Sequence, residues 1–268
     1  MKKGKLGNIY LILVFIILYA PIFYLMYYSF NSGGTMFHFK GFTLDYYKDV
    51  FHDTRLFIIV LNTLIIALLS AAISTILGVI GAIAIYVVRR RQTKNTLLTL
   101  NNVLIVSPDV VIGASFLILF TIIGIKLGFM SVLISHIAFS VPIVVIMVLP
   151  KLQEMSPTLI DAARDLGASR PYVLSKVVLP FITTGIFAGF FMALTYSLDD
   201  FAVTFFVTGN GFSTLSVEIY SRARTGVSLS INALSTLIFL FTIILVIGYY
   251  YINQKYRRSI RAGGGPRK

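Results

Sequence analysis

The chain has 268 residues, of which 57% are hydrophobic and only 12% are charged, and its mean hydropathy is +0.88. A soluble domain of this size has no way to hide so much apolar surface, so the composition predicts an integral membrane protein. The net charge of +13 does not indicate nucleic-acid binding, because the basic residues lie in short runs beside apolar stretches. The absence of cysteine excludes disulfides and thiolate metal sites.

Six apolar stretches are long enough to cross about 30 Å of hydrocarbon, which takes roughly 20 helical residues. They lie at 9–30, 57–88, 97–125, 130–150, 181–207 and 230–252. The predicted fold class is therefore all-α, a multi-pass transmembrane protein of about six spans. Residues 1–8 precede the first span. Residues 253–268 follow the last span, and we expect this tail to be disordered because it is rich in glycine and charge.

Lysine and arginine predict the orientation. Most of the 23 basic residues lie at the two termini, near 89–94 and within 151–180, and these segments share one side of the six predicted spans. Cytoplasmic segments carry the excess of Lys and Arg. We therefore expect both termini and the 151–180 segment in the cytoplasm, with the segments 31–56 and 208–229 outside.

The segment 151–180 carries a pattern that indicates two short helices. Ser156 can accept a hydrogen bond from a free helix-start N–H, and Pro157 suits a first helical turn. Gly167 can adopt the left-handed conformation that ends a helix, and Ser169 with Pro171 can begin the next one. Such a glycine elbow can lie at a membrane surface and fit a groove in a soluble partner. The small apolar face expected on the first helix consists of Leu159, Ala162, Ala163 and Leu166.

The run from Asp161 to Ala168, followed by Leu179 and Pro180, resembles the EAA motif of permeases of the ABC importer superfamily. Asp161 stands where that family usually has Glu. The resemblance implies that this loop docks a cytoplasmic ATPase; an amphipathic interfacial hairpin is the alternative. The implied coupling residues are Asp161, Ala162, Ala163, Asp165, Leu166, Gly167, Ala168, Leu179 and Pro180.

Further short motifs extend the resemblance over nearly the whole chain, to PotC-type permease subunits of spermidine/putrescine importers. They are Ser107-Pro108-Asp109, Leu127-Gly128-Phe129, Ser135-His136-Ile137, Ser197-Leu198-Asp199-Asp200-Phe201, Ile219-Tyr220-Ser221 and Asn232-Ala233-Leu234-Ser235-Thr236. The resemblance implies a type I ABC importer transmembrane domain over 9–252 that forms half of a pore. The implied partners are a PotB-like second permease, a PotA-like ATPase dimer and a PotD-like extracytoplasmic polyamine-binding protein.

Three acidic residues, Asp109, Asp199 and Asp200, fall within predicted spans, where a carboxylate costs about 2.5–3.5 kcal/mol on insertion scales. The functional interpretation is a cation pathway, and the alternative is an interhelical hydrogen bond or a charge that snorkels to the membrane interface. Counted along straight helices, Asp109 lies about 18 Å into its span and the pair about 27–29 Å into theirs, which predicts a staggered set. Tyr196 shares a helix face with either member of the pair and offers a ring to an ammonium group.

Other residues allow two interpretations. Glu218 and Tyr220 can meet a substrate at the outer mouth, or they can belong to an ordinary solvated loop. His136 has no second acid or histidine at helical spacing, which favours hydrogen-bonded packing over a proton relay. The pattern of Gly185 and Gly189 indicates close packing against a neighbouring span or a partner permease.

The sequence as a whole predicts a permease that imports polyamines and is not itself an enzyme. The chain contains no Walker A loop, so ATP and Mg would be bound by the partner ATPase, and we expect no cofactor on this chain. The alternatives are an ABC importer for ferric ion or another small solute, and an ATP-independent cation carrier. Anionic substrates fit poorly with the three carboxylates.

Overall fold

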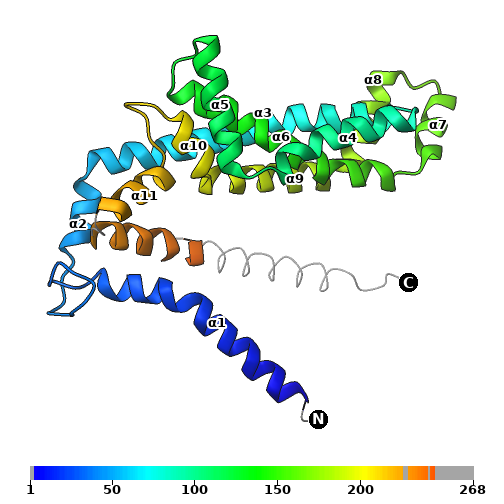
Figure 1. Cartoon of the computed structure of the whole chain (residues 1–268). Coiled ribbons are helices and arrows are strands. Elements are labelled where there is room, and N and C mark those ends of the chain that lie inside the picture. The colour runs from blue at the N-terminus through cyan, green and yellow to red at the C-terminus, as the bar shows by residue number, and fades with distance from the viewer. Residues whose placement is uncertain (1–2, 226–228, 241, 245–268) are drawn as a thin grey trace. The chain divides into compact units, whose positions relative to one another are not determined.

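The computed structural model describes residues 3–225, 229–240 and 242–244. These residues are helical apart from loops and one isolated antiparallel bridge between Asn31 and Phe42. The chain divides into two compact units, one formed by 1–54 with 221–268 and the other by 55–220 (Figure 1). The expected tail 253–268 and the end of the sixth predicted span lie outside the described residues.

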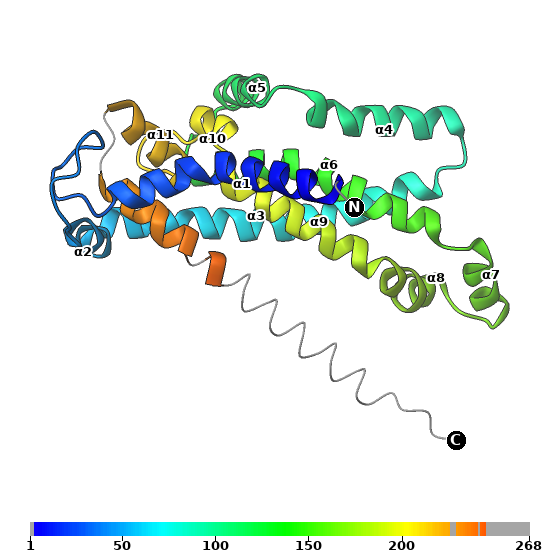
Figure 2. The same cartoon turned by 90° about the horizontal axis from the view of Figure 1, so that it is seen from below.

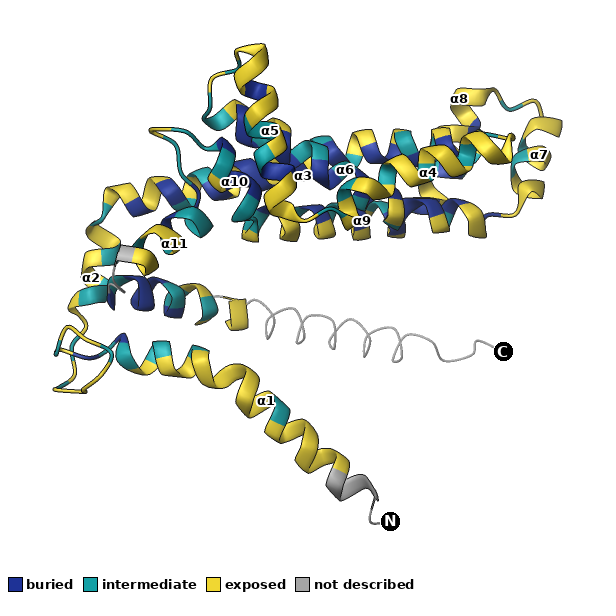
Figure 3. Cartoon of the chain, in the orientation of Figure 1, coloured by how far each residue is buried: buried dark blue, intermediate teal, exposed yellow. Residues whose placement is uncertain are grey.

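The first unit contains α1 (Lys3–Tyr28), α2 (Asp45–His52) and the helical residues 229–240 and 242–244. Residues 7–28 of α1 are apolar and long enough to span a membrane, and none of them is buried within the chain (Figure 3). Asn31 organises the loop after α1. Its amide donates to the carbonyls of Thr35 and His38, while its oxygen accepts from the N–H groups of Gly33 and Lys40.

The second unit is a helical bundle with short helices at both ends. Figures 1 and 2 show α7 and α8 at one end of the long helices, and α5 and α10 toward the other. The helices α8 and α9, joined by the π-helical turn η1, form one continuous apolar helix over Arg170–Asp199. The elements are α3 (Thr54–Val87), α4 (Arg91–Val106), α5 (Asp109–Ile123), α6 (Phe129–Glu154), α7 (Pro157–Asp165), α8 (Arg170–Val173), η1 (Leu174–Val178), α9 (Leu179–Asp199), α10 (Ala202–Val207) and α11 (Leu215–Thr225), which continues into the first unit.

Glycines let α3 and α9 approach α6 closely. A Cβ atom at Gly78 of α3 would lie 2.5 Å from Cβ of Val144, and one at Gly189 of α9 would lie 3.1 Å from Cγ1 of the same side chain. Val144 is fully buried in the core that the three helices share. A Cβ at Gly185 would lie 3.0 Å from the Met147 carbonyl oxygen. The expected packing of Gly185 and Gly189 is confirmed, and their neighbour is α6.

Among the described residues, four helices are long and apolar enough to cross a membrane: α1, α3, α6 and the Arg170–Asp199 helix. The α4–α5 pair is a fifth span if the two are counted together. This agrees with about six predicted spans, because the sixth, 230–252, is described only at 230–240 and 242–244, which are helical. The predicted third span 97–125 corresponds to this bent pair, so it is not the straight helix along which the depth of Asp109 was counted.

The break in that span has a local cause. Pro108 has no N–H and its backbone is extended, so α4 stops at Val106, and α5 restarts at Asp109 with a bend of 102°. Figure 2 shows α5 end-on while α4 runs across the view. The straight-helix depth assigned to Asp109 therefore does not hold.

The fifth predicted span, 181–207, also needs correction. Its helix begins earlier, at Arg170, and ends at Asp199. Asp200 has an extended backbone, with ψ at 120°, and separates α9 from the short helix α10.

Candidate transport pathway and coupling loop

Asp109 and Tyr196 meet at the bend between α4 and α5. The Tyr196 hydroxyl donates a 2.9 Å hydrogen bond to Oδ1 of Asp109, which is the exposed first residue of α5. The Tyr196 ring also packs edge-on against Phe139 of α6, with centroids 5.1 Å apart. From helical spacing, Tyr196 was expected beside Asp199 or Asp200. Its hydroxyl is instead hydrogen-bonded to Asp109, a contact that the spacing did not predict. Asp109 thus lies beside the last turn of α9.

The two adjacent aspartates differ sharply in their surroundings. Asp199 is exposed, and no ion pair joins it to another described residue. Asp200 is 5% exposed at its side chain and accepts hydrogen bonds from the backbone N–H groups of Val203 (3.3 Å) and Thr204 (2.8 Å). It also accepts from the Thr204 hydroxyl at 2.7 Å. Asp200 therefore closes the start of α10, in the manner of a helix-capping carboxylate.

A buried polar chain joins four helices behind Asp200. His136 of α6 is fully buried, with Nδ1 2.7 Å from the Ser197 hydroxyl and Nε2 2.8 Å from the Thr204 hydroxyl. Thr204 donates its single proton to Asp200, so its oxygen accepts from Nε2–H of His136, which also lies 3.5 Å from Oδ2 of Asp200. The Ser197 hydroxyl also accepts a 2.9 Å hydrogen bond from that of Ser70 of α3. Hydrogen-bonded packing of His136 agrees with these contacts.

Glu218 and Tyr220, which were predicted to lie at the outer mouth of the pathway, are on α11, and both side chains contact other residues. Glu218 is 5% exposed and forms a 3.1 Å ion pair with Arg55 at the start of α3. The Tyr220 ring packs 4.3 Å from that of Phe201 and 5.9 Å from that of Phe205. These contacts argue against an ordinary solvated loop. A role toward substrate stays a prediction.

The coupling loop contains the glycine elbow that the sequence predicts. Gly167 has φ of +81°, and no atom lies within 4 Å of a Cβ placed there. Its N–H donates to the Arg164 carbonyl (2.8 Å), and the Ala168 N–H donates to the Ala163 carbonyl (3.1 Å), which is the Schellman arrangement. Ser156 lies at the expected cap position without making a side-chain cap, because its hydroxyl is bonded to that of Thr158.

The residues of the predicted docking motif fall into two sets. Ala163, Ala168 and Leu179 pack against the bundle core and support the loop from inside the protein, whereas Pro180 lies in the first turn of α9 and is exposed. Five others are exposed, and Leu166 is the most exposed at 89%. This outward set consists of Asp161, Ala162, Asp165, Leu166 and Gly167.

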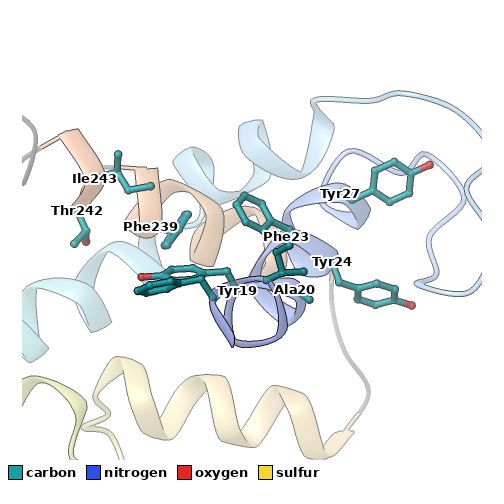
Figure 4. Close-up of a pocket in the computed structure, with 10 residues that line it drawn as sticks. Tyr19, Ala20, Phe23, Tyr24, Tyr27, Phe239, Thr242 and Ile243 are labelled. Atoms are coloured by element: carbon teal, nitrogen blue, oxygen red, sulfur yellow. The ribbon is translucent and has the colours of Figure 1, made fainter. Parts of the chain in front are cut away.

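A large groove in the first unit is apolar. It measures about 1030 Å³ and lies between α1 and the side chains of Phe239, Thr242 and Ile243 (Figure 4). Rings of Tyr19, Phe23, Tyr27 and Phe239 contribute to its walls, and none of its described lining residues is charged. It provides no counter-charge for a cation. Within the described ranges, no three His, Cys, Asp or Glu side chains gather where a metal ion would bind.

Comparisons with known proteins agree with this architecture. The PotC permease protein of the spermidine/putrescine transport system of Haemophilus influenzae is 34% identical over 255 residues, which cover 95% of this chain and 99% of the relative. The putrescine transport system permease protein PotI of Escherichia coli K12 is 32% identical over 258 residues, covering 94% and 92%. A bacterial ABC transporter structure, involved in import of the acidic polysaccharide alginate, has a TM-score of 0.71 at 19% identity and covers 96% of each chain.

The resemblance expected from the short motifs is confirmed by these relatives, and the all-α permease fold is confirmed by the solved structure. The family model described as the binding-protein-dependent transport system inner membrane component matches residues 74–258. The chain therefore belongs to this family of ABC importer permeases.

Proposed function

We propose that this chain is the permease subunit of an ATP-driven importer of polyamines such as spermidine and putrescine. The named substrates of the PotC and PotI relatives support this assignment. Its chemistry is supported by the carboxylates near the end of α9. A polyamine needs negative charge to replace water around each ammonium group and aromatic surface along its methylenes.

The observation that carries the proposal is the set of Asp109, Asp199 and Tyr196. The Tyr196 hydroxyl donates to Asp109, and Asp199 follows Tyr196 by three positions on α9. Neither carboxylate forms an ion pair with another described residue, and both are exposed. Uncompensated carboxylates in a membrane protein favour a cationic ligand or an aqueous path. Asp200 is not part of this proposed path, because its oxygens are used by α10.

The proposed complex contains a PotB-like second permease, a PotA-like ATPase dimer that binds ATP and Mg, and a PotD-like binding protein outside the membrane. The outward face of α7 would dock the ATPase, since Leu159 and Leu166 are 46% and 89% exposed beside Asp161 and Asp165. Both termini and α7 would lie in the cytoplasm, as the distribution of Lys and Arg favours.

The test is polyamine uptake by Asp109→Asn and Asp199→Asn variants. Each change keeps the size and polarity of the side chain and removes its charge. Loss of one charge-assisted contact of about 1.5–3 kcal/mol corresponds to about tenfold or more, and at least one variant should lose uptake to this extent. Spermidine uptake should suffer more than putrescine uptake, because the more highly charged substrate needs more counter-charge.

The matched control is Asp49→Asn, which removes an exposed carboxylate of α2. This variant should transport normally, and all variants should assemble and hydrolyse ATP. Wild-type uptake of both amines by both Asp109→Asn and Asp199→Asn would refute the pathway and leave the substrate assignment without chemical support.

A further inference from the structure

A second cavity lies behind the coupling loop. It measures about 510 Å³ and is enclosed by the last turns of α3 and α6, by α7 and by the α8–η1 segment. Its floor is apolar and includes Ile83, Leu152 and Val173. The described residues that line it include no acidic side chain.

Three arginines from separate segments border this cavity. Arg89 follows α3, Arg164 belongs to α7 and Arg170 begins α8. No ion pair or side-chain hydrogen bond joins any of these guanidinium groups to another described residue, and all three residues are exposed. Three uncompensated positive charges around an apolar floor are complementary to an amphiphile with an anionic head.

The depth of the cavity fits the headgroup layer of a bilayer. The 26 residues of α6 extend for about 39 Å at 1.5 Å per residue, and a bilayer including its headgroups measures about 40–45 Å. Leu152 and Met155, at the end of α6, line the cavity. A helix of this length that crosses the bilayer would place the cavity at the level of the phosphate groups and first acyl methylenes of a lipid.

The cavity also faces away from the proposed ATPase surface. Ile160 and Arg164, one turn apart on α7, line it, whereas Leu159 and Leu166 are exposed on other faces of this segment. Acidic side chains of a partner docked on the two leucines would meet a different face of α7.

We propose that this cavity binds the headgroup of an anionic phospholipid such as phosphatidylglycerol. The three arginines hold the phosphate, and the apolar floor takes the first methylenes of the acyl chains. The lipid then links α7 to the ends of α3 and α6, so that movement of the docking helix and of the spans is coupled through it. This site does not depend on the identity of the transported substrate.

The test is native mass spectrometry of the full-length chain, co-expressed with its partner subunits and supplied with phosphatidylglycerol or phosphatidylcholine. Wild-type protein should retain phosphatidylglycerol at least tenfold better than phosphatidylcholine. The triple change Arg89→Gln, Arg164→Gln and Arg170→Gln should abolish this preference. The control removes the same charge from nearby residues outside the cavity, through Arg90→Gln, Arg91→Gln and Lys94→Gln, and should keep it.

A second variant distinguishes loss of lipid binding caused by lost charge from loss caused by misfolding. The triple change Arg89→Lys, Arg164→Lys and Arg170→Lys keeps the positive charge and should keep most of the lipid preference. The proposal is wrong if wild-type protein shows no preference, or if the control loses as much lipid as the glutamine variant. It is also wrong if the lysine variant loses the lipid completely, or if millimolar inorganic phosphate displaces the lipid, which would indicate a site for small soluble anions.

Discussion

Asp199 and Asp200 are neighbours in sequence with different surroundings. Successive helical residues point about 100° apart, and α9 ends between these two. Asp199 therefore stays on the exposed face, while Asp200 turns into the buried polar chain of His136, Ser197 and Thr204. Asp200 therefore stabilises the start of α10, although it is the sequence neighbour of a residue in the proposed cation path.

Changing Asp200 to Ala should therefore destabilise the protein, whereas Asp199→Ala should not. The first change removes the acceptors for the N–H groups of Val203 and Thr204 and for the Thr204 hydroxyl, at a cost of about 1–3 kcal/mol per buried group left unpaired. The second change should stay within about 0.5 kcal/mol. Thermal unfolding in detergent measures the stability of both variants. An equal loss of stability in the two would contradict the structural role assigned to Asp200.

At the scale of elements, α7 owes its end to a single backbone conformation. The left-handed Gly167 lets two N–H groups return to carbonyls of the same helix, so α7 ends without help from another segment. The chain can then reverse toward α8 within three residues. A side chain at this glycine would meet no other atom, so its effect is confined to the backbone.

Gly167→Val should weaken coupling and leave membrane insertion intact. A β-branched residue disfavours the left-handed conformation by about 1–2 kcal/mol, and this misplaces both short helices. Copurification of the ATPase and substrate-stimulated ATP hydrolysis should both fall. Gly124→Val is the matched control, because Gly124 also has positive φ (+75°) and open space, but it ends α5. Normal ATPase assembly in the Gly167 variant would exclude the docking role.

At the scale of the whole molecule, the sequence distributes its basic residues unevenly among the segments that connect the predicted spans, which predicts an orientation. The wild-type sequence has no cysteine, so any cysteine introduced is the sole reactive thiol. Thr93 lies on α4, and Gly34 and Asn210 lie in the loops expected on the opposite side; all three are exposed.

Labelling of single-cysteine variants should follow this asymmetry. A cysteine at Thr93 should react with a membrane-impermeant reagent only after the cells are opened, because we expect it in the cytoplasm. Cysteines at Gly34 and Asn210 should react in intact cells. A reversed pattern would overturn the expected orientation and place α7 out of reach of a cytoplasmic ATPase.

Local features were predictable from the sequence and long-range contacts were not. The elbow at Gly167 and the interruption at Pro108 follow from the backbone preferences of those residues. The Tyr196–Asp109 hydrogen bond joins residues 87 positions apart, and the His136 contacts span 61 and 68 positions. Residue spacing along a single helix cannot predict such contacts. The spacing of Asp200 and Thr204 was a usable signal, since a carboxylate often caps a helix that starts just after it.

The length of α7 has a consequence for assembly. This helix has nine residues, and a stable protein–protein interface buries about 1,600 Å² in total, well beyond what such a short helix can cover. Two permease chains on one ATPase dimer would supply two docking helices, and the second contact would then form at high effective concentration. A lone permease should therefore release its ATPase readily, while the paired arrangement holds it through avidity.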